Sequence, residues 1–199
     1  MSKVLVDTID TRSGTSTMQI GSTNTTTINL GVSGDTVNIP SGVTFANSGT
    51  ATGFGDNTPA FSVYLNAAMS LTNNKTSKVT YDTEKVDTDS AFASNKFTVP
   101  AGGAGTYYFI HAPTIQSTGA GAYLCRSYVY VNGSEVTRSD SRIIAGTGHY
   151  ENTPIAIYMA TLSVSDYVEG YARIEGGTST ITVESGARSW FIGYKIIGA

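Results

Sequence analysis

The sequence holds little of the chemistry on which most enzymes rely. It has one cysteine and two histidines in 199 residues. A single cysteine allows no disulfide within the chain, and the alternating residues around Cys125 predict an inward-facing, inert thiol. His111 and His149 are suited to general-base catalysis near neutral pH, but neither lies in a nucleophile elbow, a metalloprotease pattern or a Cys/His metal cluster. We therefore expect a non-enzymatic protein without a cofactor, in which His111 is structural.

Charge and long apolar runs are also scarce. Charged residues make up 14% of the chain and the net charge is −3, whereas about 25% charged residues is usual. The chain has no basic run with interleaved aromatics, so we expect no nucleic-acid partner. No window approaches the roughly 18 apolar residues of a membrane helix, which predicts no membrane insertion. The N-terminus lacks the apolar core of a secretory signal peptide.

The residues that are abundant favour strands and turns. Gly, Ser, Thr and Asn supply most of the polarity, while Thr, Val, Ile and Tyr suit pleated surfaces. No segment repeats its apolar residues at the helical period, and many short strands without helices predict a sandwich or a jelly roll. The predicted strands are 61–66, 77–81, 96–99, 106–115, 122–131, 135–144, 153–163, 167–175 and 189–197.

One stretch organises this pattern. In Phe97–Pro100 apolar and polar residues alternate, and Pro100 ends the strand because it has no N–H to donate. The glycine-rich run 101–105 then turns the chain, and Tyr107 and Phe109 alternate again. These features predict a β-hairpin corner whose aromatic side chains face inward. A second hairpin is predicted at Asn132-Gly133, the sequence of a type I′ turn.

The N-terminal quarter has a different texture. Short apolar–polar–apolar steps recur about every nine residues, at 18–21, 28–31 and 37–40. Ordering the backbone costs roughly 1–2 kcal/mol of conformational entropy per residue, and two apolar residues per step are too few to offset this cost in a lone chain. Neighbouring chains would therefore have to bury them. We predict an N-terminal attachment segment (1–20), with a short strand over residues 2–10, then a β-repeat stalk and neck (21–59) and a head (60–199). The alternative is a disordered polar leader.

The head resembles the globular domain shared by complement C1q and tumour-necrosis-factor-like proteins. The resemblance covers about 135 residues and consists of separated motifs in one order: Phe61-x-Val63-x-Leu65, Val79-Thr80-Tyr81-Asp82, Phe97-Thr98-Val99-Pro100, Gly105-x-Tyr107-x-Phe109, Tyr130-x-Asn132-Gly133, Asp166-x-Val168 and Phe191-x-Gly193-Tyr194. It implies a jelly roll whose protomers pack as a homotrimer. The chain departs from the animal members in lacking a Gly-X-Y collagen repeat.

The resemblance and the alternation together predict which side chains fill the core and which face other protomers. The predicted core residues are Phe61, Phe97, Tyr107, Phe109, Trp190, Phe191 and Tyr194. Outward aromatic side chains suit an oligomer interface, although they would also stack on sugars. The predicted trimer-interface residues are Tyr108, Tyr128 and Tyr130 in the head, and Ile20, Ile28 and Ile39 in the stalk.

The leader is similar to repeats in bacteriophage virion fibre proteins. This second resemblance implies a virion fibre whose N-terminus attaches to other virion proteins and whose head contacts a glycan or protein on the host surface. One alternative is a structural or decoration protein of the virion whose head is only a trimerisation clamp. Another is a secreted bacterial adhesin or signalling ligand, against which the missing signal peptide argues. A polysaccharide depolymerase would need a carboxylate pair in a much larger β-helix, so we exclude it.

Polar loops between strands are the natural contact surface, because binding residues concentrate on loops held by a rigid scaffold. The candidate receptor-contact residues are Ser117, Thr118, Arg142, His149, Tyr150, Glu151, Thr178 and Ser179. A dense acidic group is either a calcium site or a solvated connecting loop, and the loop is favoured because nothing fixes the ligand geometry. Its members are Asp82, Glu84, Asp87 and Asp89.

Overall fold

The chain folds as an all-β protein. The structure, a computed structural model, describes residues 20, 23–24, 26–46, 57–118, 121–146, 149–176 and 180–196. Within these residues every regular element is a β-strand and every strand pair is antiparallel. The chain divides into two compact units, Met1–Ala51 and Thr52–Ala199, so this division falls within the predicted neck. The strand predicted at 2–10 lies outside the described residues.

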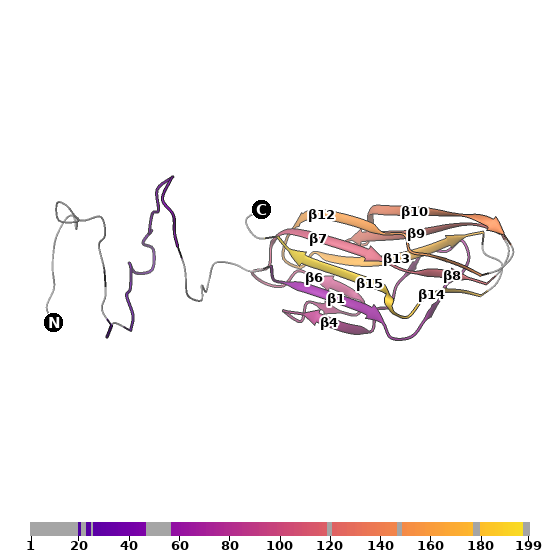
Figure 1. Cartoon of the computed structure of the whole chain (residues 1–199), viewed down its shortest axis with the longest axis horizontal. Helices are drawn as coiled ribbons and strands as arrows, with labels where there is room; N and C mark the ends of the chain where they lie inside the picture. Colours follow the sequence, from indigo (N-terminus) through magenta and orange to yellow (C-terminus); the bar gives the residue numbers. More distant parts are fainter. Residues whose placement is uncertain are drawn as a thin grey trace. The chain divides into compact units, whose positions relative to one another are not determined.

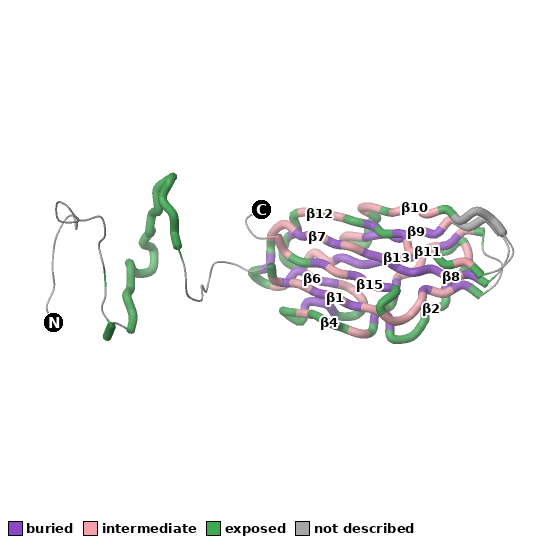
Figure 2. Tube along the Cα trace, viewed as in Figure 1, coloured by how far each residue is buried: buried purple, intermediate pink, exposed green. Residues whose placement is uncertain are grey.

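The described part of the first unit is built from turns. The backbone N–H of Asp35 donates to the carbonyl of Val32 (2.9 Å), and that of Val43 donates to Pro40 (3.2 Å). Residues 26–46 contain no strand and their side chains are exposed (Figure 2). Ile20, Ile28 and Ile39 are among these exposed side chains. The β-repeat stalk remains a prediction, because a single chain offers no neighbour to bury these residues.

The head contains three sheets (Figure 1). A five-stranded sheet has the order β12 (Ala156–Leu162), β7 (Gly105–Ala112), β15 (Gly186–Lys195), β1 (Ala60–Leu65) and β4 (Thr83–Asp87). A six-stranded sheet has the order β10 (Ser134–Gly146), β9 (Gly121–Val131), β13 (Tyr167–Glu175), β6 (Lys96–Thr98) and β5 (Phe92–Ala93), with β3 (Ser77–Lys78) also paired to β13. A small end sheet has the order β11 (Tyr150–Asn152), β8 (Ile115–Ser117), β14 (Ile181–Val183) and β2 (Met69–Ser70).

The strand pairing is that of a jelly roll. In chain order the eight main strands are β1, β6, β7, β9, β10, β12, β13 and β15. The first pairs with the last (β1–β15), the second with the seventh (β6–β13), the third with the sixth (β7–β12) and the two middle strands with each other (β9–β10). Nested antiparallel pairs divided between two facing sheets define this architecture, which confirms the predicted fold class.

The organising stretch turns out to cross between the sheets. β6 pairs with β13 and β7 pairs with β12 and β15, so the predicted hairpin at this corner is wrong. The N–H of Gly103 donates to the Pro100 carbonyl (2.9 Å), and Gly102 has a φ of 77°. A proline that cannot continue the ladder followed by permissive glycines releases the chain from one sheet to the other. At Asn132-Gly133 the predicted hairpin is present, with φ values of 51° and 78°.

Aromatic rings from both sheets form the core. Phe61 on β1 packs against Phe92 and Phe97 of the opposite sheet, with ring centroids 5.1 and 5.0 Å apart, and edge-on against Phe191 at 5.0 Å. Tyr107 and Phe109 are fully buried beside them. The core assignments of Phe61, Phe97, Tyr107, Phe109 and Phe191 are therefore confirmed, as is the inward position of Cys125.

Several strands differ from the prediction. Residues 83–87, read as a loop, form β4 at the edge of the five-stranded sheet. The predicted strand 106–115 is interrupted at Pro113, so β8 leaves β7 for the end sheet. The short strands β2, β5, β11 and β14 had no signal, because two or three residues show no measurable period.

His111 lies in the core at the end of β7, where its structural role is visible. The Ser127 hydroxyl donates to the His111 carbonyl (2.8 Å), and the His111 Nδ1–H donates to the Ser127 hydroxyl oxygen (2.7 Å). The Tyr81 and Phe191 rings pack edge-on against the imidazole. Burial lowers the pKa of His111 to about 3, so the ring is neutral over most of the pH range.

Gly170 on β13 makes room for this imidazole. A Cβ at position 170 would lie 2.4 Å from His111 Cδ2 and Nε2. We expect Gly170→Ala to lower the free energy of unfolding by about 1–3 kcal/mol, the usual effect of overpacking a core. Denaturant unfolding measures this loss, and the loss should shrink in a His111→Ala background because the colliding ring is gone. An unchanged unfolding midpoint for Gly170→Ala would contradict the packing described here.

Candidate functional site

The outer face of the five-stranded sheet is largely apolar, with Lys85 of β4 at its edge. Cross-strand register aligns its outward side chains in three rows, and none of these residues is charged. The rows are Ile157–Ile110–Ile192–Ser62–Val86, Met159–Tyr108–Tyr194–Ala60 and Ala112–Trp190–Tyr64–Thr83. Ile157 and Met159 are 51% and 60% exposed. We call these three rows the apolar face. It includes Tyr108, one of the predicted interface residues.

Two predicted core residues belong to this face instead. On β15 the inward positions are Ser189, Phe191 and Gly193, so Trp190 and Tyr194 point outward. Trp190 is half-buried and Tyr194 is 37% exposed. Their assignment to the core is therefore wrong. It rested on their aromatic side chains, whereas the alternation of side chains along a strand determines which of them face the core. Gly193 is the inward residue, and a Cβ there would lie within 2.6 Å of the Phe109 and Phe61 rings.

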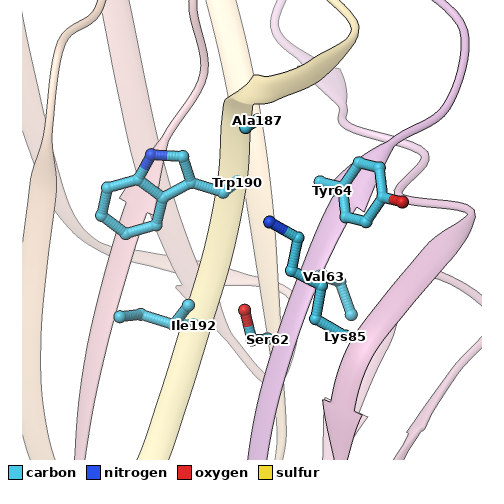
Figure 3. Close-up of a pocket in the computed structure, with 7 residues that line it drawn as sticks. All are labelled: Ser62, Val63, Tyr64, Lys85, Ala187, Trp190 and Ile192. Carbon is cyan, nitrogen blue, oxygen red and sulfur yellow. The ribbon is translucent and has the colours of Figure 1, made fainter.

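A hollow of about 90 Å³ lies on the apolar face between β15, β1 and β4. Trp190 and Ile192 form one wall and Tyr64 the other, with Ser62 at the base (Figure 3). Lys85 from β4 reaches into the mouth, where its Nζ lies 5.1 Å from the centre of the Tyr64 ring. No local pattern predicts this hollow, because its walls come from strands far apart in the chain.

The outer face of the six-stranded sheet is different in character. Arg126 contacts both Asp140 (3.1 Å) and Glu175, and Lys78 lies 2.8 Å from Glu169. Four cations and four carboxylates pair across this face; they are Lys78, Arg126, Arg138, Arg173, Glu135, Asp140, Glu169 and Glu175. These pairs make the face polar and electrically balanced.

Tyr128 and Tyr130 lie on this polar face. Tyr130 packs against Tyr171 with ring centroids 4.3 Å apart, and Tyr128 is buried beside Tyr130 at 6.2 Å. They are therefore on a different sheet from Tyr108. A single interface formed by one sheet face cannot contain all three of the predicted tyrosines.

The strands that flank the predicted contact loops 117–121, 140–150 and 176–186 meet at one end of the head, which we call the tip. Ser117 on β8 pairs with Tyr150 on β11 and with Ile181 on β14. The β9–β10 pair extends to Gly121 and Gly146, and Asn152 on β11 donates to Ser141 on β10 (2.7 Å). The jelly-roll connections thus gather loops that are far apart in the chain, which is the arrangement that a contact surface needs.

The predicted contact residues differ in how they are placed. Thr118, Arg142, His149 and Glu151 are exposed, and Tyr150 is half-buried. Ser117 is 1% exposed and its hydroxyl points into the protein, so it is not a contact residue, because the strand period turns it inward. Thr178 and Ser179 lie outside the described residues.

Sequence reasoning missed other residues of the tip. The Gln116 side-chain amide donates to the imidazole of His149 (2.8 Å), and Arg188 pairs with Glu151 and with Glu184 (3.9 Å). The sequence does contain a signal for Gln116, because it directly follows the apolar Ile115 and successive side chains of a strand point to opposite faces. In the structure both of its neighbours on β8 are buried. Arg188 has none, because only the fold brings β15 beside β11.

Two of the four acidic candidates accept backbone hydrogen bonds. The Asp87 carboxylate accepts the backbone N–H groups of Ala91 (2.9 Å) and Phe92 (3.1 Å), and Asp82 accepts that of Asn66 (2.7 Å). Among the described residues no three His, Cys, Asp or Glu side chains are close enough to hold a metal ion. Asp87 and Asp82 hold neighbouring backbone in place, which is a loop-ordering role.

No helix in the described part of the chain is long and apolar enough to cross a membrane.

No protein-family model matches the sequence, and no curated protein matches it. Among solved structures the chain is similar to the globular domain of zebrafish complement 1qA protein, at 21% sequence identity over 69% of this chain and 96% of that one, with a TM-score of 0.45. It is also similar to murine APRIL, at 10% identity over 69% of this chain and 98% of that one, with a TM-score of 0.47. The assignment of the jelly roll rests on this chain's own strand pairing.

Proposed function

We propose that this chain is a non-enzymatic virion fibre protein whose head assembles as a homotrimer through the apolar face and contacts a host surface through the tip. In this proposal the N-terminal segment attaches to other virion proteins and the protein is displayed on the virion surface. The observation that carries it is the apolar face: one uncharged row extends across all five strands and two more across four, opposite a face on which ion pairs cross the sheet.

Copies of the same chain are the occupants that this face suits. A large exposed apolar patch marks an interaction surface, and closed rotational symmetry is the usual arrangement of copies. Because the three rows carry no charge, copies that meet along them face no like-charge repulsion there. Lys85 lies beside the rows, at the β4 edge. Tyr108, Trp190 and Tyr194 supply the large amphipathic side chains that oligomer interfaces favour.

Charge insertion on this face tests the assembly. We expect Ile110→Lys, at the centre of the apolar face, to convert a trimer into monomers, because three buried ammonium groups would meet without partners. Tyr130→Lys is the matched control: it places the same charge on a central strand of the six-stranded sheet, beside Glu135, and should leave the trimer intact. Sedimentation of both variants decides the matter.

Two further outcomes bear on this test. Met159→Lys repeats it at an edge position that is 60% exposed, where the fold of one chain should tolerate lysine. If Met159→Lys and Ile110→Lys both remain trimeric while Tyr130→Lys dissociates, the interface lies on the polar face and the proposal is wrong.

The tip supports the attachment function. It presents hydrogen-bonding side chains from separate strands, including Gln116, His149, Glu151 and Arg188. Three copies of such a site act at high effective concentration, so weak single contacts suffice for attachment. The alternative, a decoration protein whose head is only a clamp, has the same apolar face but requires nothing of the tip.

Binding to bacterial cells and to a glycan array separates these two functions. The full-length trimer should bind, and Gln116→Ala combined with His149→Ala should weaken binding while the trimer mass is unchanged. The matched control is Arg138→Ala, on the polar face away from the tip. If the full-length protein binds none of the cells and glycans, the clamp function is favoured.

A further inference from the structure

We propose that Ile157 of one copy inserts into the hollow lined by Trp190, Tyr64 and Ile192 of the next copy, so that the trimer closes by three identical head-to-tail contacts. This inference deepens the proposed self-assembly, on which it rests. The apolar face carries a protruding side chain at its β12 edge and a hollow towards its β4 edge. Ile157 is 51% exposed, and the hollow is about 90 Å³, room for several water molecules rather than one.

The Ile157 side chain cannot reach the hollow of its own chain. Ile157 lies on β12 and Ser62 on β1, and the order β12-β7-β15-β1 places three strand spacings between them. At about 4.8 Å per spacing the two residues are about 14 Å apart. An Ile157 side chain that enters the hollow must therefore come from another molecule, and a protrusion and a hollow on opposite edges of one face define a heterologous contact. Such contacts close into a ring when the rotation between copies allows it.

Strand register places the two features at the same height. Ile157 pairs with Ile110, Ile110 with Ile192, and Ile192 with Ser62. All four belong to one row that crosses the sheet. In this proposal the threefold axis runs parallel to the strands. Rotation about such an axis moves a residue sideways but leaves its height unchanged, so Ile157 of one copy arrives opposite Ile192 and Ser62 of the next. Met159, two residues further along β12, belongs to the row of Tyr108 and Tyr194 and arrives below the hollow.

The chemistry of the hollow suits an aliphatic side chain. Its walls are an indole, a phenol ring and an isoleucine, which gain from excluding water and match the composition of interface hot spots. Lys85 occupies the mouth, yet it has no carboxylate partner among the described residues. Its contact with the Tyr64 ring is cation–π. Its flexible stem lets the ammonium move to solvent over the β4 edge while the methylene groups stay against the rings.

Paired cysteines test this contact in the full-length protein. Ile157→Cys combined with Ser62→Cys should, on mild oxidation, give disulfide-linked dimers and trimers on non-reducing electrophoresis and no larger species. Disulfides need Cα atoms roughly 4.4–6.8 Å apart, so the pair links only if β12 of one copy lies on the hollow of the next. Cys125 does not interfere, because it is fully buried and burial raises its pKa to about 11.

Each single variant is a control, and neither should crosslink. If Ile157→Cys alone gives covalent dimers, β12 edges meet each other and the head-to-tail contact is wrong. A protein with trimer mass whose double variant stays uncrosslinked also overturns the contact, although self-assembly then stands. A wild-type protein with monomer mass overturns the proposed assembly itself, so the two failures are distinguishable. As a second readout, Trp190 fluorescence should shift to shorter wavelength on assembly of the wild type and should shift less in Ile157→Ser.

Discussion

Replacement of Phe61 by alanine should lower the free energy of unfolding by about 3–5 kcal/mol, the usual effect of removing a buried phenylalanine. Phe61 is 2% exposed and touches rings on both sheets: Phe92 and Phe97 on one, Phe191 and Phe109 on the other. The substitution removes buried apolar surface and leaves a cavity at the point where the sheets meet. Because these contacts join the first strand of the head to the last, no local rearrangement can replace them.

Chemical denaturation at a fixed chain concentration measures this effect, since assembly adds stability that depends on concentration. Phe61→Leu is the matched control and should lose less, because it keeps most of the side-chain volume. A loss below about 1 kcal/mol for Phe61→Ala would mean that the aromatic cluster does not join the two sheets.

Acid should destabilise the head over an unusually wide pH range because of His111. The pKa of this imidazole is about 3 in the folded protein, lowered by burial, against about 6.5 in the unfolded chain. Between these values the unfolded state binds a proton that the folded state does not. The free energy of unfolding therefore falls as the pH decreases from 6.5 towards 3, by about 1.4 kcal/mol per pH unit, and does not depend on His111 above that range.

The side chains that face His111 leave it no charged partner. They are Ser127, Tyr81 and Phe191, with Gly170 against the ring, and burial raises the pKa of Tyr81, which stays neutral. The informative window is pH 5 to 6.5, above the range in which ordinary carboxylates titrate. The loss there should be about 2 kcal/mol. His111→Phe should flatten this slope, and His149→Ala should leave it unchanged. An equal slope in the wild type and His111→Phe would contradict the buried neutral imidazole.

The parts of the fold that the sequence predicts are those in which a strand carries its own signal. Phe61, Val63 and Leu65 alternate with polar or half-buried neighbours, and the structure buries all three. Asn132-Gly133 determines its turn by local backbone preference alone. The order of separated motifs indicated a jelly roll, which the nested pairs confirm, and the polar loops predicted as contacts do gather at the tip.

The features of the fold and of the site that the sequence does not predict depend on residues that are distant in the chain. Phe97 and Tyr107 are separated by a glycine-rich turn that fits either a hairpin or a crossing between sheets, and only the pairing of β6 with β13 decides it. Aromatic side chains suit the core and an interface equally well, so the residue types of Trp190 and Tyr194 do not show which way they face. They point outward because Gly193, between them in the alternation, is the inward residue. Ser117 is polar but inward. The hollow and the Arg188 pairs require strands from opposite ends of the head, so no local pattern encodes them.

The mass of the full-length protein in solution is the most direct test of the central claim, that copies of this chain assemble through the apolar face. Sedimentation equilibrium of the wild type over a range of concentrations should give three times the chain mass, and Ile110→Lys should give the chain mass itself under the same conditions. A wild type that sediments as a monomer at every concentration would contradict the claim, because the apolar face would then be left in water.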